Sequence, residues 1–255
     1  LEMARHRYDL TDAEWNSIEP LLPNKSRGVK RVDDRRVLNG IFWRMRVGAP
    51  WADIPERYGP HTTCYNRFVR WRKASVWARL LCAISEAYDG RVQMIDSTSV
   101  RVQQRQKGGL SDCMGRSRGG NTTKIHAIVD RNGLPIALKL TAGQAHDGKA
   151  FETMMGGIGE GTVLLADRAY DSDAIRAKLA EQGALANIRP LSVRKDPPAF
   201  SPKVYKMPNL VERFFSKLKH YRAVATRFCR HDANYLASVQ LAALRIWMRF
   251  NESVT

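Results

Sequence analysis

Two short stretches, Val-Gln-Met-Ile-Asp at residues 92–96 and Val-Leu-Leu-Ala-Asp at residues 163–167, decide the fold class of this 255-residue chain. Each reads as a buried β-strand that ends in a carboxylate. Ligands of open α/β sheets bind beyond the strand ends, so we expect Asp96 and Asp167 at the rim of a sheet. A strand-end aspartate is also a common turn or capping residue, so neither acid identifies a site by itself.

The segments that follow these strands complete an α/β pattern. Residues 124–130 and 135–141 are β-like, and the Asn-Gly pair at 132–133 between them is a strong hairpin signal. Further elements are expected as a helix over 172–183, a strand over 184–188, and helices over 209–221 and 233–250. This order predicts a mixed sheet with helices packed on it.

The first 90 or so residues have a helical pattern. Thr11 and Glu14 have the spacing of a capping box at a helix start. More helices are predicted over 33–47, 62–73 and 76–88, with Gly and Pro between them. Short helices with such breaks suit a helix-turn-helix-like module. We therefore predict a helical module at residues 3–89 and an α/β domain at residues 90–255.

The chain is strongly basic, with 42 Lys and Arg against 25 Asp and Glu and a formal net charge of +17. This surplus favours a polyanionic partner, most often nucleic acid, although a merely basic or ribosome-associated protein is the alternative. Four scattered cysteines without paired spacing argue against a zinc site or a disulfide framework. The polar start and the lack of a long apolar run predict a cytoplasmic protein without a membrane partner.

Two segments concentrate the basic residues. The helix predicted over 62–73 reads either as a DNA-reading helix or as the solvated basic face of a core helix. The Gly-rich stretch 101–120 cannot form a core, so we expect it to be mobile or ordered by a partner.

A third acid, Glu212, lies on the predicted helix 209–221. Its apolar side is formed by Leu210, Phe214, Phe215 and Leu218. Glu212 is near the edge of that stripe, so it could point from helix to sheet, where an unpartnered acid is costly. A metal ion would remove this cost. Carboxylates that bind hard divalent cations suit phosphodiester chemistry, because such ions activate the attacking oxygen and neutralise the leaving oxygen.

A series of short motifs makes the sequence recognisable. They are LTDAEW (10–15), RRVLNGIFW (35–43), GAPW (48–51), YNRF (65–68), IDST (95–98), GRSRGG (115–120), TKIHA (123–127), GQAHD (143–147), ADRAYD (166–171) and NLVERFF (209–215). On these motifs the chain resembles bacterial insertion-sequence transposases of the DDE class, in the group named for insertion sequence number five. The resemblance implies an RNase H-like catalytic domain with two Mg²⁺ ions, which Mn²⁺ can replace. It also implies an N-terminal region that binds the element's terminal inverted repeats.

The resemblance also assigns roles to residues. Asp96, Asp167 and Glu212 match the family's acidic triad, which is catalytic and binds the metal. In the family pattern Y-x2-R-x3-E-x6-K, this chain has Tyr205, Glu212 and Lys219, but Pro208 stands at the Arg position. Arg clamps phosphate through a planar fork and Pro cannot, so either a neighbouring basic residue replaces it or this copy is impaired.

We expect DNA contacts from side chains of both halves. They are Arg35, Arg36, Arg67, Arg70, Arg72, Arg116, Arg118, Lys124, Arg168, Tyr205, Arg213 and Lys219. His126 either approaches the acidic site or is a satisfied core histidine.

The sequence therefore predicts a nucleoid-associated DNA transposase that binds double-stranded DNA at the element ends and in the target. It would cleave the ends and join the 3′-OH groups to target DNA, acting as a homodimer because two ends are cut together. One alternative is a nuclease that hydrolyses without joining. The other is an inactive or domesticated relative that only binds DNA.

Overall fold

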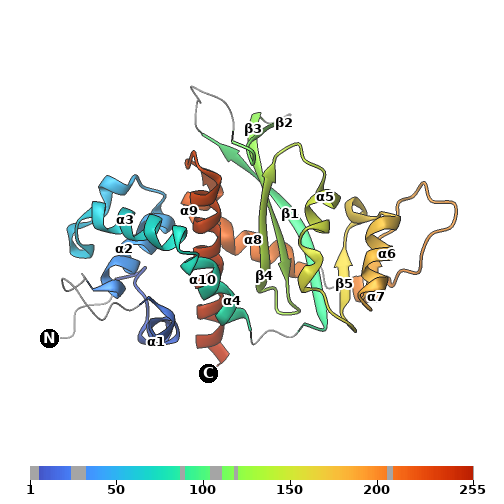
Figure 1. The fold of residues 1–255 in the computed structure, drawn as a ribbon, viewed down its shortest axis with the longest axis horizontal. Coiled ribbons are helices and arrows are strands. Elements are labelled where there is room, and N and C mark those ends of the chain that lie inside the picture. Colours follow the sequence, from blue (N-terminus) through green and yellow to red (C-terminus); the bar gives the residue numbers. More distant parts are fainter. Residues whose placement is uncertain are drawn as a thin grey trace. The chain divides into compact units, whose positions relative to one another are not determined.

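A computed structural model describes residues 6–23, 33–86, 90–103, 111–117, 120–205 and 209–254 (Figure 1). The chain forms two compact units. The helical unit combines Leu1–Glu86 with Leu218–Thr255, and the sheet unit is Ala87–Lys217. No helix in the described ranges is long and apolar enough to cross a membrane.

The sheet unit contains the mixed sheet that the sequence predicts. Its central strand β1 (Val92–Val102) pairs antiparallel with β3 (Gly120–Val129), which pairs antiparallel with β4 (Pro135–Ala142). On its other side β1 pairs parallel with β5 (Val163–Ala166), and β5 pairs parallel with β6 (Leu185–Ile188). The short strand β2 (Gly115–Ser117) extends the edge beside β3. The strand order β4-β3-β1-β5-β6 therefore joins an antiparallel half to a parallel half.

The predicted hairpin between β3 and β4 is confirmed. Asp130 accepts hydrogen bonds from the backbone N–H groups of Asn132 and Leu134, 2.9 and 2.8 Å long, which close the turn. Gly133 has φ +75°, and a Cβ there would lie 3.0 Å from the Leu210 carbonyl oxygen. Only glycine combines this left-handed backbone with so close an approach.

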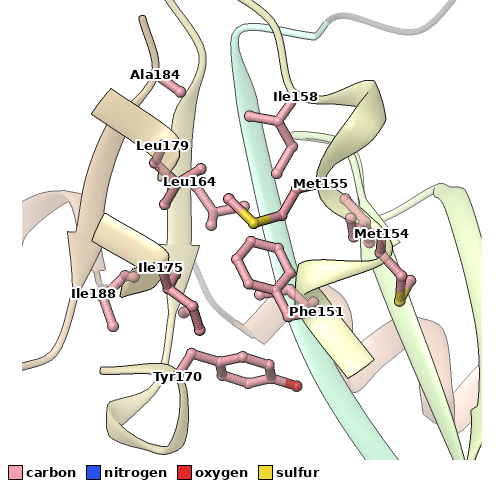
Figure 2. Close-up of a cluster of buried hydrophobic side chains, with 13 residues drawn as sticks. Phe151, Met154, Met155, Ile158, Leu164, Tyr170, Ile175, Leu179, Ala184 and Ile188 are labelled. Atoms are coloured by element: carbon pink, nitrogen blue, oxygen red, sulfur yellow. The ribbon is translucent and has the colours of Figure 1, made fainter. Parts of the chain in front are cut away.

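Helices cover one face of the sheet. They are α5 (Asp147–Glu152), the 3₁₀ turn η4 (Met155–Gly157) and α6 (Asp173–Glu181). Their apolar side chains form a buried cluster with Ile95, Ile128 and Leu164 from the strands. Figure 2 shows Phe151 of α5 above the Tyr170 ring, and the two rings meet edge to face with centroids 5.8 Å apart. The cluster fixes the loops that leave β4 and β5, on which acidic residues lie.

The helical unit starts with α1 (Asp12–Ile18), where the predicted Thr11–Glu14 capping box is present. Its other elements are η1 (Glu19–Leu21), α2 (Asp34–Val47), η2 (Trp51–Asp53), η3 (Glu56–Tyr58), α3 (His61–Lys73), α4 (Val76–Ser85), α9 (Arg222–Ala225), β7 (Thr226–Arg227) and α10 (Asp232–Val254). Phe68, Trp71 and Trp77 are buried, and the Trp77 ring contacts the rings of the other two. The predicted helical character of this region is confirmed.

The long helix α10 belongs to the helical unit, although the sequence assigned all of residues 90–255 to one domain. It packs against α1, α3, α4 and α9. Arg245 of α10 donates a 2.6 Å hydrogen bond to the Glu14 carboxylate, and both side chains are almost fully buried. Such a contact across 231 residues leaves no periodic signal in the sequence. The functional division of the chain at residue 89 stays a prediction.

Candidate active site

Asp96 lies within β1, and Asp167 directly follows the adjacent parallel strand β5. The predicted strand end at Asp96 is wrong, because pairing with β3 continues β1 to Val102. The pairing of β1 with β5 runs from Val92 opposite Val163 to Met94 opposite Leu165. Each acid follows two residues beyond this last pair, so both stand at one level of the sheet. Because side chains alternate along a strand, Asp96 projects from the same face of β1 as Met94.

Local backbone groups orient both carboxylates. The Asp96 Oδ1 accepts a 2.7 Å hydrogen bond from the Ser97 N–H. The Asp167 Oδ1 accepts a 2.8 Å hydrogen bond from the Ala169 N–H and caps the 3₁₀ turn η5 (Arg168–Tyr170). The capping role of a strand-end aspartate is therefore present at Asp167, beside any catalytic role.

Glu212 lies on α8 (Asn209–Lys219) as the sequence predicts. Val211, Phe214 and Leu218 on this helix are buried, whereas Glu212 is exposed next to that apolar side. The boundary between the two units, at Lys217, falls within α8, and Glu212 belongs to the sheet unit.

The electrostatics of Asp96 connect it with the other acids. The pKa of Asp96 is raised to about 6, first by burial and then by the negative charges of Asp167, Asp147 and Glu212, against the lowering effect of the Ser97 N–H. Like charges raise a carboxyl pKa only when they are close to it. Asp167 and Glu212, the two other acids predicted from the sequence, thus both act on Asp96, and Asp147 does so as well.

The chemistry of these carboxylates, but not their spacing in this structure, suits a divalent cation. In the part of the chain that the structure describes, no three His, Cys, Asp or Glu side chains are close enough to hold a metal ion. The raised pKa of Asp96 nevertheless reports a cost of burying and crowding its charge. A cation bound by the acids would offset this cost, and carboxylates are the ligands that Mg²⁺ prefers.

The sequence analysis did not identify Asp147 as a member of the site. Asp147 is the first residue of α5, and the preceding residue His146 caps this helix by accepting from the Gly148 N–H. The Asp147 carboxylate forms a 2.8 Å ion pair with Lys124. The GQAHD motif contains this acid, but its closeness to Asp96 appears only in the folded chain.

His126 is a buried core histidine that also approaches the acidic site, and its Nδ1 makes no hydrogen bond among the described residues. Its side chain is fully buried, and its Nε2 lies 2.8 Å from the Thr141 hydroxyl. Burial lowers the pKa of His126 to about 4. The charge of Asp147 raises this pKa and that of Lys124 lowers it, and the ring is neutral at physiological pH. Its Nδ1 lies 4.0 Å from Asp147, so the histidine borders the acidic site.

Tyr205 is also close to the acids. It lies on α7 (Pro202–Tyr205) and is half-buried, with its ring 5.2 Å from that of Phe200. Burial raises the pKa of Tyr205, followed by the charge of Asp167, and Asp96 and Glu212 add to this. The basic residues Arg168 and Arg213 each follow one of the acids in sequence and are exposed.

Asp171, at the end of the ADRAYD motif, anchors the loop after β6. Its buried carboxylate accepts hydrogen bonds from Arg176, Arg194 and the Leu191 N–H, 2.9, 2.6 and 2.8 Å long. Burial by itself raises the pKa of Asp171, but the bonds from Arg194, Leu191 and Arg176 outweigh it and lower the pKa. Asp171 thus holds the loop that leads toward Tyr205, and the Asn187 side chain holds it again at the Ser201 backbone.

Some of the other predicted DNA contacts have partners within the protein, and others face solvent at least in part. Arg35 pairs with Asp12, and Arg36 donates to the carbonyl oxygens of Arg57 and Glu56. Arg67 is buried, pairs with Asp34 and lies over the Trp71 ring. Lys124 is held by Asp147 and by the Ala145 carbonyl oxygen. The remaining ones are exposed or half-buried, namely Arg70, Arg72, Arg116 and Lys219. Arg118 and Pro208 lie outside the described residues.

The sequence is similar to known transposases in both of its halves. Residues 87–247 match the family model described as "Transposase DDE domain", and residues 10–81 match that of the "Putative transposase of IS4/5 family". A Brucella ovis protein named "Putative transposase for insertion sequence element IS6501" is 36% identical over 129 residues, which are 50% of this chain and 99% of that protein. The "Insertion element IS402 uncharacterized 16.2 kDa protein" of Burkholderia cepacia is 33% identical over 129 residues, 45% of this chain and 88% of that protein.

A solved structure shares the fold. The piggyBac transposase, in a synaptic complex with hairpin DNA, has a TM-score of 0.58 and 11% identity, over 100% of this chain and 77% of that chain. This likeness supports the RNase H-like assignment of the mixed sheet. Because its family model covers most of the chain, including Asp96, Asp167 and Glu212, this protein belongs to the family of transposases with a DDE domain.

Proposed function

We propose that this transposase binds the terminal inverted repeats of an insertion element, cleaves the DNA at the element ends and joins the 3′-OH ends to target DNA. The observation that carries the proposal is the placement of Asp96 on β1 and of Asp167 directly after the adjacent strand β5, with Glu212 close enough to raise the pKa of Asp96.

Asp96, Asp167 and Glu212 would hold two Mg²⁺ ions, for which Mn²⁺ can substitute. When bound, such ions lower the pKa of the attacking oxygen and neutralise the leaving oxygen. The contribution of Asp96 is its negative charge, because a carboxyl with a pKa of about 6 has released its proton to solvent at neutral pH. The contribution of Asp167 is a carboxylate oriented by the Ala169 N–H.

No covalent bond between protein and DNA is needed. The Tyr170 hydroxyl lies near these acids, but its ring is in the buried cluster, and burial followed by the charges of Asp147 and Asp96 raises its pKa. It is therefore poorly suited as a nucleophile. In the proposed scheme water attacks first, and the 3′-OH that it frees attacks target DNA in a second displacement.

Side chains beside the acids would position the DNA strand. Arg168 and Arg213 are exposed next to the two acids that they follow, and Tyr205 presents its ring close to the same charges. Guanidinium groups pair with phosphate through two parallel hydrogen bonds. Since two element ends must be processed together, we propose that the active protein is a homodimer.

The decisive experiment compares DNA binding with DNA cleavage. Asp96→Asn and Glu212→Gln should each abolish cleavage of a duplex that carries the element end, with Mg²⁺ present, and should leave binding of that duplex unchanged. Cleavage that survives either substitution would show that the acidic triad is assigned wrongly.

A strand-transfer assay separates the proposal from its two rivals. Pre-cleaved ends with a free 3′-OH should be joined to a target plasmid by the unmodified protein. Hydrolysis without joining would identify a nuclease, and binding without either reaction would identify an inactive relative. If the unmodified protein has low strand-transfer activity, Pro208→Arg tests whether the missing arginine limits that activity. A restored phosphate contact should then increase strand transfer.

A further inference from the structure

A cleft in the helical unit gathers basic side chains from segments that are far apart in the sequence. Its volume is about 630 Å³. The N-terminal segment, the last turn of α2 and the junction of α8 with α9 line it with Arg7, Tyr8, Arg46, Lys219, His220 and Arg222. The cleft is open to solvent, because Arg7, Lys219 and Arg222 are exposed.

The charge in this cleft is uncompensated. Four of its side chains are cations, and no Asp or Glu lines it. Other arginines of the helical unit have acidic partners, namely Arg35, Arg67, Arg227 and Arg245. Within the described ranges, by contrast, no ion pair involves Arg7, Arg46, Lys219 or Arg222. Cations collected in a concave surface without acids raise the local concentration of anions.

The cleft is also held in shape. The Arg46 guanidinium lies 5.2 Å from the centre of the buried Tyr221 ring, and this stacking orients its planar fork. Gly48 ends α2 with φ +78°, and a Cβ there would lie 2.8 Å from the Cβ of Arg222. Glycine therefore lets the end of α2 approach α9 and brings Arg46 and Arg222 to the same cleft.

A simpler role explains only part of this arrangement. Arg46 stands in the last turn of α2, where a cation complements the partial negative charge of the helix end. That role needs neither Arg222 nor the two cations from the other segments.

We propose that this cleft binds the phosphate backbone of duplex DNA, as a contact surface of the helical unit separate from α3. The inference rests on the proposed function and adds the surface that carries the DNA. Arginine forks match phosphate oxygens, and an open cleft with several cations suits a polymer with a regular series of phosphates.

The test measures binding of a fluorescent 30-base-pair duplex by anisotropy over a series of salt concentrations. The double substitution Arg46→Gln with Arg222→Gln should weaken binding on the order of tenfold at 100 mM salt and reduce the salt slope by about 1.8, because two phosphate contacts are lost. The matched control is Arg79→Gln with Arg230→Gln, which removes the same charge from exposed positions of the helical unit outside the cleft. This control variant should change the salt slope of duplex binding much less than the cleft variant does.

A charge-conserving variant excludes unfolding as the cause. Arg46→Lys with Arg222→Lys should retain most of the salt slope, and circular dichroism should be the same for all variants. The inference is overturned if the cleft variant keeps the affinity and slope of the unmodified protein, or if cleft-dependent binding is tighter for duplex RNA of the same sequence. If the unmodified protein binds no duplex at all, the proposed function fails together with it.

Discussion

The Lys124 ammonium lies 2.8 Å from the Asp147 carboxylate, and the Nδ1 of the buried His126 lies 4.0 Å from the same oxygen. Lys124 and His126 are two residues apart on β3 and therefore share a face of the sheet. Asp147 is thus held by a cation on one side, while its charge raises the pKa of Asp96. The site therefore contains a fourth acid with a partner of its own.

Asp147→Asn should lower the pKa of Asp96 from about 6 toward its ordinary value, because one of three nearby negative charges is removed. Carbon-13 NMR titration of the aspartate carboxyl groups in the metal-free protein measures it. Asp173→Asn, at an exposed position of α6, is the control and should leave the titration unchanged. An unaltered Asp96 titration in Asp147→Asn would show that Asp147 does not act on the site.

Asp96→Asn should stabilise the metal-free protein at pH 8, by on the order of 2 kcal/mol. The folded pKa of Asp96 is raised to about 6 from an ordinary value of 3.8, so the folded state binds the proton more tightly. Stability contributed by the protonated form is therefore lost as the pH rises from about 4 to 6. In thermal unfolding with EDTA, the melting temperature of the variant should exceed that of the unmodified protein at pH 8 and should equal it near pH 4. A variant that is less stable at pH 8 would contradict the electrostatic cost.

Asp171→Asn should destabilise the sheet unit by about 3 kcal/mol at pH 7, because a buried carboxylate with two arginine partners is removed. The folded pKa of Asp171 is lowered, so its contribution is present above the ordinary pKa of 3.8 and is lost as the pH falls through the folded value. The difference between variant and unmodified protein should therefore shrink below about pH 4.

Trypsin gives an independent measure of the same anchor. Arg189, Arg194 and Lys195 lie in the loop that Asp171 holds, and cleavage there should be faster in Asp171→Asn. Equal cleavage rates in both proteins would mean that other contacts hold this loop.

Arg245→Ala should cost about 3–5 kcal/mol of stability, because it leaves the buried Glu14 carboxylate without its main partner. The double variant Arg245→Met with Glu14→Gln should be less destabilised than Arg245→Ala, since no buried charge remains unpaired. Urea unfolding of the single and double variants forms the test. Additive effects would show that the pair contributes no coupling energy.

Two arginines of α3 should respond differently to substitution. Arg67→Gln should lower the melting temperature, because the side chain is buried, pairs with Asp34 and stacks over Trp71. Arg70→Gln, at an exposed position of the same helix, should leave the melting temperature unchanged and weaken duplex binding. If Arg70→Gln binds duplex as tightly as the unmodified protein, α3 is not the DNA-reading helix.

Local patterns predicted the sheet well. The apolar runs before Asp96 and Asp167 form adjacent parallel strands, and Asn132-Gly133 forms the hairpin turn, because each depends on neighbouring residues only. The capping box at Thr11 and Glu14 is local in the same way. These patterns constrain only a few neighbouring backbone torsions, so they can be recognised in the sequence before the tertiary structure is known.

Contacts between distant segments could not be predicted. The sequence marks Glu14 as a capping residue and does not show that Arg245 reaches it. It presented Arg35, Arg36, Arg67 and Lys124 as cations available to DNA, whereas their partners appear only once the chain is folded. Asp147 was missed for the same reason, because its closeness to Asp96 depends on α5 packing against β3.

The division of the helical unit between residues 1–86 and 218–255 has a consequence for synthesis on the ribosome. All of residues 87–217 emerge before α10, which supplies Arg245 to Glu14 and buries the apolar sides of α1 and α4. A nascent or prematurely terminated chain therefore carries an incomplete helical unit with a buried acid left unpaired. The protein therefore gains its full helical unit only after translation has passed strands β1 to β6.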